Sequence, residues 1–440
     1  MSLKVGLRKL LPRWIFGFYH LLWAVLANII YRWPSRHLII IGVTGTKGKS
    51  TVSAMITHAL NTLGQSCGLL STATIKIGEQ QWLNDLKMTM PGRLKMQKYL
   101  SQMVSAGHNY AVVETSSEAI VQWRHFGINY DAAVFTNLTP EHIESHGSFE
   151  NYKNAKLKLW QVLSKSSKKN LMGKQVEKVS VVNIDDKSAA DFLKFNISKT
   201  LIYGVDIKIH LPGVQEVSAH EVQTSANKIS FTIENVNFSL PIGGLFNVYN
   251  ALAATALLRG ENYSLEQIAN ALKSFQGAPG RLEYIKAGQE FNVVVDYAHT
   301  AESLEAVYKT LAGDNKNLIA VLGSCGGGRD KDKRPRLGEL AARYAKKVII
   351  TNEDPYDEDP ITIMKEVMSG ALAHGKVLND NLFLIADRRQ AIAEAFKSAA
   401  SADDVVIITG KGSEQWLVTA QGKVPWDDRT VAKEELKKII

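Results

Sequence analysis

Cysteine is scarce in this sequence: Cys67 and Cys325 are the only two among 440 residues. A pair so far apart does not suggest the disulfide framework of small secreted domains, so a reducing cytoplasm is the simpler compartment. Low-complexity segments and short-period repeats are also lacking, which argues against fibrous proteins and repeat arrays. Hydrophobic residues at 45% and charged residues at 22% are typical of a globular chain, and the length predicts about three domains.

Acidic residues are absent from the first 78 positions, which hold nine Lys and Arg residues. The whole chain has 52 Lys and Arg residues against 43 Asp and Glu, so the remainder is balanced and the net charge of +9 belongs to the N-terminal part. This distribution argues against a diffuse nucleic-acid-binding surface. It fits anionic lipid or a polyphosphate as a ligand, or simply a solvated basic end.

A hydrophobic run of full membrane-spanning length is not evident. Residues 14–31 form an apolar and aromatic stretch of 18 residues, interrupted by Gly17, His20 and Asn28. A span needs about 20 residues. No small-residue cleavage site follows the stretch, which argues against a cleaved signal peptide. Three alternatives stay open: a helix packed on the next domain, a peripheral contact with the membrane, and a true span.

A phosphate loop is the first positive signal in the chain. The branched residues 38–43 run into a glycine-rich loop, and a helical pattern begins at Ser50. Such a turn points backbone N–H groups and a helix N-terminus at a polyphosphate. Lys49 is expected to reach the β- and γ-phosphates, and Ser50 to bind Mg²⁺, although Val43 stands where the general pattern has glycine. The predicted nucleotide-binding residues of the loop are Thr44, Gly45, Thr46, Lys47, Gly48, Lys49, Ser50 and Thr51.

Strand and helix patterns alternate from residue 38 onward. They predict an α/β fold whose central domain has a mainly parallel sheet with helices on both faces. The predicted strands are 38–43, 110–114, 132–136 and 180–184, and the predicted helices are 50–63, 92–106, 149–163, 247–259 and 265–274. Residues 201–243 contain short alternating segments such as 228–233 and 236–240, and we expect an antiparallel appendage there.

The sequence Gly277-Ala278-Pro279-Gly280 marks a domain boundary. A second alternating series follows it and predicts a doubly wound, Rossmann-like domain. Its predicted strands are 292–297, 318–322, 347–351, 382–385 and 404–408, and its predicted helices are 302–311, 336–344, 361–368, 389–398 and 432–438. The expected organisation is a helical segment at 1–36, a central ATP-binding domain at 37–280 and a C-terminal domain at 281–440.

Polar residues near predicted strand ends are candidates for metal binding. Glu114 ends a strand, where the carboxyl ends of a parallel sheet face the ligand crevice and where Mg²⁺ finds oxygen ligands. A turn or helix cap is the alternative role for Glu114. His142 belongs to a group of two histidines and two acids at 141–146, which suits a metal or a phosphate. The amphipathic helix at 149–163 does not single out Lys156 among its lysines.

The second half of the chain holds further candidates for nucleotide contact. Asn247 and Asn250 lie three residues apart, on one face of a helix, and their amides suit the edge of adenine. Arg281 stands beside the domain boundary and could reach a phosphate in a closed state. Each of these signals is weak by itself, because Asn and Arg are also common in turns and on surfaces.

Taken together, these motifs resemble the Mur ligase family, most closely its muramyl-tripeptide synthetases (MurE type). These ATP-dependent enzymes add the third amino acid to UDP-N-acetylmuramoyl-dipeptide, and the related folylpolyglutamate synthetases share the loop variant. The stretches that carry the resemblance are Thr44–Ser50, Glu114–Ser117, Thr136–His142, Ala155–Lys156, Asn247–Asn250, Gly280–Glu283, Asp296–Thr300 and Gly410–Glu414.

The resemblance implies roles that spacing alone does not indicate. Lys156 matches the lysine that is carbamylated to become a magnesium ligand, and His142 matches a second magnesium ligand. Asp296 and His299 match positions where the C-terminal domain meets the nucleotide. The implied catalytic residues are Lys49, His142, Lys156 and Arg281, the implied metal ligands are Ser50, Glu114, His142 and Lys156, and the implied substrate contacts are Thr89, Ser116, Ser117, Asp354, Tyr356 and Glu414.

The implied reaction joins a carboxylate to an amine through an acyl phosphate, with ATP and Mg²⁺ required. The implied partners are a muramyl-peptide precursor and a free amino acid, without nucleic acid, and a monomer in the cytoplasm is expected. The family's N-terminal uridine-binding domain has only residues 1–36 in its place, which leaves open whether the acceptor is UDP-linked. A same-fold ligase for folates and a non-catalytic, membrane-associated nucleotide-binding partner remain the alternatives.

The motif that reads the incoming amino acid departs from the family pattern. Diaminopimelate-adding members have Asp-Asn-Pro-Arg where this chain has Glu353-Asp354-Pro355-Tyr356. The guanidinium that would hold the distal carboxylate is missing, so diaminopimelate is not expected as the substrate. Asp354 suggests a cationic side chain instead, such as that of lysine.

Overall fold

The computed structural model describes residues 13–86, 88–141, 146–313, 317–328 and 331–440, with side chains from residue 19 onward. The chain divides into two compact units. The first contains the residues up to Val222 together with Phe231–Ser239 and Val248–Phe275, and the second contains Gln223–Ser230, Leu240–Asn247 and Gln276–Ile440. Among the described residues, no helix is long and apolar enough to cross a membrane.

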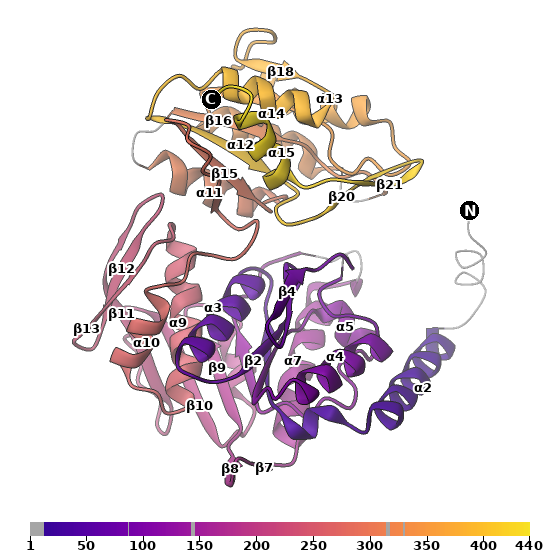
Figure 1. Ribbon diagram of the computed structural model, residues 1–440, viewed down its shortest axis with the longest axis vertical. Coiled ribbons are helices and arrows are strands. Elements are labelled where there is room, and N and C mark those ends of the chain that lie inside the picture. Colours follow the sequence, from indigo (N-terminus) through magenta and orange to yellow (C-terminus); the bar gives the residue numbers. More distant parts are fainter. Residues whose placement is uncertain (1–12, 87, 142–145, 314–316, 329–330) are drawn as a thin grey trace. The chain divides into compact units, whose positions relative to one another are not determined.

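An eleven-stranded sheet forms the centre of the first unit (Figure 1), in the order β13-β12-β11-β10-β9-β6-β1-β5-β2-β3-β4. The central strand β1 (Ile39–Thr44) is buried along its whole length, as expected for a β-branched run inside a parallel sheet. The other strands are β2 (Cys67–Leu70), β3 (Thr74–Ile77), β4 (Gln80–Leu83), β5 (Tyr110–Glu114), β6 (Ala132–Phe135), β9 (Val179–Asn183), β10 (Lys199–Val205), β11 (Gln215–Thr224), β12 (Ile229–Ile233) and β13 (Val236–Leu240).

The parallel core of this sheet sets the position of the loop residues. Strand β1 lies between β5 and β6 and pairs in parallel with both, so Val43 is opposite Glu114. The prediction of an antiparallel appendage at 201–243 is wrong for its first half, since β10 pairs in parallel with both β9 and β11. These strands extend the central sheet. An alternating pattern reports one buried face and carries no information on strand direction.

Helices cover this sheet, and most lie where the sequence predicted them. They are α2 (Arg13–Tyr31), the 3₁₀ turn η1 (Pro34–His37), α3 (Lys49–Thr62), α4 (Arg93–Ser105), α5 (Ser117–Val121), α7 (Phe149–Lys165), α8 (Ala189–Leu193), α9 (Leu245–Gly260) and α10 (Leu265–Leu272). A small hairpin, β7 (Lys169–Leu171) and β8 (Lys174–Val176), follows α7. Helix α2 packs against α4, as the packed-helix alternative for the N-terminal apolar stretch predicts, and this packing involves one side of the helix.

The second unit has a six-stranded sheet in the order β14-β15-β19-β16-β17-β18. All its pairs are parallel except β14–β15, in agreement with the predicted doubly wound fold. Its strands are β14 (Glu283–Tyr284), β15 (Asn292–Asp296), β16 (Asn317–Leu322), β17 (Lys347–Ile350), β18 (Leu382–Leu384) and β19 (Asp404–Thr409), with a separate hairpin of β20 (Trp416–Thr419) and β21 (Gly422–Pro425). Its helices are α11 (Ala301–Ala312), α12 (Lys333–Tyr344), α13 (Pro360–Ala373), α14 (Arg388–Lys397) and α15 (Asp428–Leu436).

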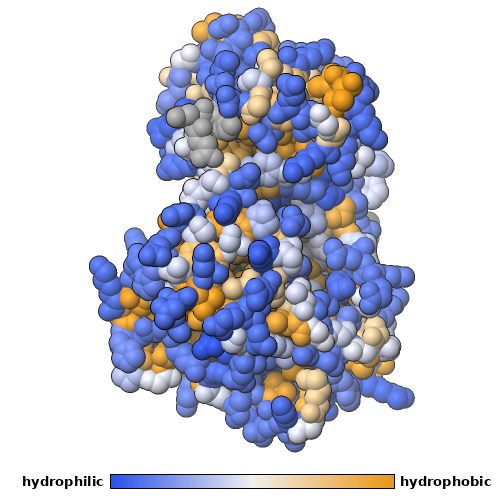
Figure 2. Space-filling model, turned by 60° about the vertical axis from the view of Figure 1, so that its left-hand side comes forward, coloured by the Kyte–Doolittle hydropathy of each residue, from blue (hydrophilic) through white to orange (hydrophobic). Residues whose placement is uncertain are grey.

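Two buried clusters of apolar residues lie on the opposite faces of this second sheet, as a doubly wound fold requires. The face of the molecule drawn in Figure 2 is mainly hydrophilic, with apolar residues in small groups. Both units thus have the ordinary organisation of α/β domains.

Candidate active site

The phosphate loop connects the end of β1 to the start of α3. Gly48 precedes the helix with φ 81°, and a Cβ at this position would overlap the side-chain oxygen of Asn250. Glycine is therefore required twice here, for the left-handed backbone and for the close approach of the amide. Lys49 turns back over the loop, and its Nζ donates to the carbonyl oxygen of Thr46 at 2.8 Å.

The residues that follow the neighbouring strand β6 hold the loop in place. The N–H of Thr46 donates to the Asn137 carbonyl oxygen at 2.8 Å, and the N–H of Lys47 donates to Asn137 Oδ1 at 2.9 Å. Thr136 Oγ1 donates to the carbonyl oxygen of Lys47 at 2.7 Å. The Lys47 ammonium pairs with Glu141 at 2.7 Å. The segment after β6 is therefore part of the loop's own scaffold.

Glu114 lies buried at the end of β5, as predicted, and faces the start of α3. Its Oε2 accepts hydrogen bonds from Ser50 Oγ at 2.9 Å and from the N–H of Thr72 at 2.7 Å. Its Oε1 accepts from Thr72 Oγ1 at 2.9 Å, and the same hydroxyl lies 3.0 Å from Thr89 Oγ1. This is a set of hard oxygen donors beside a phosphate loop, which is the ligand chemistry that Mg²⁺ prefers.

Lys156 is fully buried on the inner face of α7, next to the phosphate loop. Its Nζ donates to the carbonyl oxygen of Gly45 at 2.6 Å and lies 4.3 Å from the centroid of the Tyr152 ring. Among the described residues, no carboxylate forms an ion pair with it. Burial, together with the nearby charge of Lys49, holds the pKa of the Lys156 amine well below its usual value. The neutral, nucleophilic form of this amine is therefore favoured more than it is for an exposed lysine.

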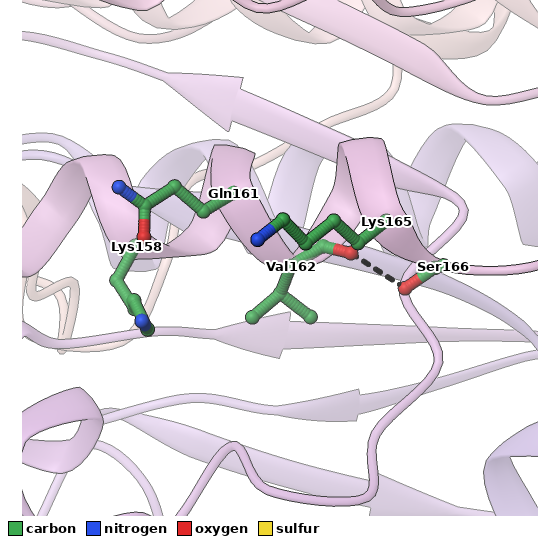
Figure 3. Close-up of a pocket in the computed structure, with 5 residues that line it drawn as sticks. All are labelled: Lys158, Gln161, Val162, Lys165 and Ser166. Atoms are coloured by element: carbon green, nitrogen blue, oxygen red, sulfur yellow. Dashed lines mark hydrogen bonds between the residues drawn. The ribbon is translucent and has the colours of Figure 1, made fainter.

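Lys49 and Lys156 line one cleft of about 180 Å³ in the first unit, and the Glu114 donor set is joined to it through the hydrogen bond from Thr72 to Thr89. Its lining residues are Lys49, Met88, Thr89, Ser116, Ser117, Glu118, Arg124, Tyr152 and Lys156. The structure therefore brings together Lys49, Lys156 and the predicted substrate residues Thr89, Ser116 and Ser117. A wider open groove of about 290 Å³ lies elsewhere on α7, between Lys158 and Lys165 (Figure 3), and contains none of the predicted site residues.

Several residues at or beside the cleft were missed by the sequence analysis, and three of them show why. Thr72 follows β2, a strand that was not predicted, and Arg124 lies in an irregular segment after α5. Tyr152 was treated as part of an amphipathic helix, yet its hydroxyl lies 3.1 Å from Thr46 Oγ1. The signal that could have found Thr72 is the Ser-Thr-Ala-Thr stretch directly after the apolar residues of β2, because strand ends at this edge of a parallel sheet face the crevice.

His142 falls outside the described residues, so its predicted metal role stays a prediction. A neighbour from the same cluster, His146, lies with Nε2 3.1 Å from Ser117 Oγ. Within the described part of the chain, no group of three or more His, Cys, Asp or Glu side chains is arranged to hold a metal. The donor set at Glu114 is not such a group, because it consists of one carboxylate and several hydroxyl groups.

The second unit holds the remaining predicted residues, and it is described by itself. The guanidinium carbon of Arg281 lies 4.2 Å from the centroid of the Tyr297 ring, and His299 packs edge-on against the same ring. Asp296 is buried, and it accepts from the N–H groups of Leu282 at 2.7 Å and Ala298 at 2.6 Å. Asp296 therefore holds the backbone around Arg281 in place.

Asp354 and Glu414 both engage Lys411 in this unit. The Lys411 Nζ lies 2.9 Å from Asp354 Oδ2 and 2.5 Å from Glu414 Oε2. The other oxygen of Asp354 accepts from the N–H of Val418 at 2.8 Å. Both carboxylate oxygens of Asp354 thus have a partner within the unit, and its expected role with a cationic substrate stays a prediction. Tyr356 stands beside it with φ 56°, and its N–H donates to the carbonyl oxygen of Val418 at 3.1 Å.

Asn247 and Asn250 lie on α9, as predicted. Asn250 is buried against the phosphate loop at Gly48. Asn247 Nδ2 donates to the carbonyl oxygen of Gly243 at 2.8 Å. Of the two amides, Asn250 is the one that the structure places at the loop.

A phosphate loop with an oxygen donor set on one side and a buried lysine beside it defines the class of a phosphate-loop enzyme. The Mur ligase middle domain model matches residues 43–258, and the Mur ligase glutamate ligase domain model matches residues 280–412. The chain belongs to the Mur ligase family, whose members are ATP-dependent ligases, and it is such a ligase.

Named relatives support this assignment. The chain is 37% identical over 417 residues to the UDP-N-acetylmuramoyl-L-alanyl-D-glutamate–2,6-diaminopimelate ligase of Bacillus cereus, covering 94% of this chain and 81% of the relative. It is also 37% identical over 425 residues to the UDP-N-acetylmuramyl-tripeptide synthetase of a Roseiflexus species, covering 94% and 82%. A solved structure of a diaminopimelate ligase of this type matches with a TM-score of 0.62 and 31% identity, covering 92% of this chain and 79% of the other.

Proposed function

We propose that this ligase extends a muramyl-peptide precursor of the cell wall by one amino acid, using ATP and Mg²⁺. The observation that carries the proposal is a cleft lined by Lys49 and the buried Lys156, with the Glu114 donor set joined to it through the hydrogen bond from Thr72 to Thr89. The names of the relatives support the acceptor class. The identity of the added amino acid is left to experiment, because Tyr356 stands in place of the arginine that diaminopimelate-adding members have.

In this proposal the reaction has two steps. A carboxylate oxygen of the acceptor attacks the γ-phosphorus of ATP, the bond from that phosphorus to the bridging oxygen breaks, and ADP leaves. The amine of the incoming amino acid then attacks the acyl carbon, phosphate leaves with its electron pair, and the nitrogen loses a proton to give the amide. The first step brings anions together, so the main task of the protein is to neutralise and position charge.

The residues of the cleft suit this task. Lys49 and the N-terminus of α3 bind the polyphosphate through positive charge and backbone N–H groups. Ser50 and Glu114 would hold Mg²⁺, with His142 as a further expected ligand, and the ion would supply positive charge at the phosphates. Ser116 and Ser117 lie where they can position the acceptor. Arg281, Asp296 and His299 are assigned to the nucleotide from the C-terminal domain.

Lys156 is proposed to act as a carbamate. Its neutral amine attacks carbon dioxide, a C–N bond forms, and one proton is released to solvent. The product carries two oxygens with a negative charge, which converts a group that cannot bind Mg²⁺ into one that can. The lowered pKa of the buried amine favours this reaction because only the unprotonated form is a nucleophile.

The proposal also includes a place of action. We infer a monomer in the cytoplasm, with the central domain at 37–280, the C-terminal domain at 281–440, and residues 14–31 in peripheral contact with the inner face of the membrane. The basic N-terminal part of the sequence supports the membrane contact.

The experiment is phosphate release from ATP with UDP-N-acetylmuramoyl-dipeptide as acceptor, a panel of amino acids, and products weighed by mass spectrometry. We expect release that needs both the acceptor and one amino acid, with the matching gain in mass. Absence of product, while a control ligase is active, would contradict this acceptor. Folates and lipid-linked muramyl peptides would then be tested.

Lys156→Ala tests the carbamate. We expect phosphate release to fall by at least about 100-fold and to recover in part when a short carboxylate is added, since the charge of a metal ligand is lost. Lys158→Ala is the matched control: it removes an exposed lysine from the same helix and should leave the activity unchanged. Full activity of Lys156→Ala without added carboxylate would rule out the carbamate.

A further inference from the structure

Helix α2 carries a row of apolar side chains on its solvent side. Tyr19, Leu22, Trp23, Leu26, Ile29 and Ile30 are between 38% and 60% exposed. They recur at intervals of three and four residues, so they form one stripe along the helix. We call these six residues the outer stripe. Exposed apolar patches of this kind are uncommon on monomeric soluble proteins and mark an interaction surface.

The opposite side of α2 is fixed to the first unit. Ala24, Ala27 and Asn28 are buried, and α2 packs against α4. Asn28 Nδ2 donates to the carbonyl oxygen of Phe126 at 3.2 Å. The absence of a Cβ at Gly127 leaves room for the Asn28 amide. Because this side is already occupied by the protein itself, only the outer stripe is presented to a partner.

Positive charge surrounds the stripe at its C-terminal end. Arg32 and Arg36 follow α2 and are exposed, and the Arg36 guanidinium lies 5.3 Å from the centroid of the Trp33 ring. In the sequence the first 78 residues contain nine cations and no acid. A partner of complementary charge is therefore anionic and presents an apolar layer next to its charges.

The basic surface continues onto α7. Ser35 Oγ accepts from the N–H of Asn129 at 3.1 Å, and Asn129 Nδ2 donates to the carbonyl oxygen of Ser167 at 3.2 Å, just beyond the end of α7. The groove of Figure 3 opens on this part of α7, with the exposed Lys158 and Lys165 on its walls. Cations thus lie both directly after α2 and on α7, whose end is linked to the segment after α2 through Asn129.

We propose that the outer stripe docks onto a bilayer that contains anionic phospholipid, with α2 lying in the plane of the interface. Tyr and Trp suit the headgroup level, and Leu and Ile suit the acyl boundary beneath it. Arg32 and Arg36 contact lipid phosphates. This inference rests on the peripheral location included in the proposed function, and it adds the contact face, the lipid class and the orientation of the helix.

The test is sedimentation of the full chain with vesicles of phosphatidylcholine alone or mixed with phosphatidylglycerol. We expect the wild type to bind the mixed vesicles and to lose binding at high salt. Leu22→Glu combined with Ile29→Glu should weaken binding at least tenfold. Arg32→Gln and Arg36→Gln should each weaken binding to mixed vesicles by about fivefold, with little effect on phosphatidylcholine.

The matched control is Val377→Glu combined with Leu378→Glu, which puts the same charge on two exposed apolar residues of the second unit. It should bind vesicles like the wild type. Absence of wild-type binding, or equal losses in the two double variants, would overturn the proposal. So would a dimer of the wild type that dissociates in Leu22→Glu/Ile29→Glu, since the stripe would then be covered by a second copy. Phosphate release without vesicles, measured in parallel, reports on the ligase separately.

Discussion

The local sequence pattern predicts a place in the site for Glu114, but it does not do so for Lys156. Glu114 ends an apolar strand, and the direction of a parallel sheet alone places its carboxylate at the crevice. Lys156 belongs to a helix with many lysines, and its burial follows from how α7 packs on the sheet, which is a tertiary property. The resemblance to a known family, and no local pattern, pointed to it.

Glu114→Gln tests the metal site at the level of one charge. Glutamine keeps the shape and can accept from Ser50 and Thr72 with one oxygen, so we expect the free energy of unfolding to change by less than about 1 kcal/mol. The Mg²⁺ concentration needed for half-maximal phosphate release should rise at least about tenfold, since the anionic ligand is lost.

Glu150→Gln, on the exposed side of α7, is the control and should leave the Mg²⁺ dependence unchanged. An unchanged dependence in Glu114→Gln as well would place the metal elsewhere. Thermal unfolding of both variants separates a loss of metal binding from a loss of folding.

Most helices and strands could be predicted because burial imposes a regular pattern of apolar residues on their sequences. The strands of both parallel sheets are runs of Val, Ile and Ala between turn residues, and β5 and β13 were predicted to the residue. Strands at the edges were missed: β3 and β4 are short, and β4 has two exposed glutamines and no apolar run. The direction of β10 and β11 was wrong because it depends on the connection between them and leaves no mark in the side chains.

Two glycines at the ends of helix α3 give a prediction about the phosphate loop. Gly48 and Gly64 have nearly the same φ, 81° and 82°, at the two ends of α3, but a Cβ meets Asn250 at Gly48 and nothing within 4 Å at Gly64. Gly64→Ala should cost about 1 kcal/mol of unfolding free energy for the left-handed backbone alone. Gly48→Ala should cost clearly more, because the Asn250 amide or the loop must move, and it should weaken ATP binding at least tenfold.

Calorimetric unfolding and ATP titration of the two variants check this comparison. Equal effects on stability would mean that the contact between Asn250 and the loop carries no weight. Unchanged ATP binding in Gly48→Ala would mean that the loop is not the phosphate site.

At the scale of the whole molecule, the buried His125 and the partly buried Glu261 of the first unit have opposite effects on stability as the pH changes. Burial lowers the pKa of His125 to about 4, and its buried Nδ1 has no hydrogen-bond partner among the described residues. Burial also raises the pKa of Glu261 to about 7, although the Tyr110 hydroxyl donates to it at 3.1 Å. Neither group belongs to the cleft, so their effect is on folding.

The signs of the two effects are opposite. In the unfolded chain His125 is protonated below its ordinary pKa of 6.5, whereas in the folded protein it stays neutral down to about pH 4. Between these two values a fall in pH favours the unfolded chain, so the stability decreases as the pH falls from 6.5 to 4. In the folded protein Glu261 stays protonated up to about pH 7, whereas in the unfolded chain it is ionised above pH 4.5. Between these two values a rise in pH favours the unfolded chain, so the stability decreases as the pH rises from 4.5 to 7. Between about pH 4.5 and 6.5 the two slopes largely cancel.

Single substitutions should expose each slope. Relative to the wild type, His125→Gln should gain up to about 3 kcal/mol of unfolding free energy as the pH falls from 6.5 to 4, and Glu261→Gln should gain about as much as the pH rises from 4.5 to 7. Denaturant unfolding at several pH values measures both differences, and groups common to all three proteins cancel in the comparison. Because glutamine at 261 can still accept from Tyr110, a pH-independent offset is expected to be small.

If the unfolding free energies of the variants ran parallel to that of the wild type over the whole pH range, these two groups would have ordinary pKa values in the folded chain.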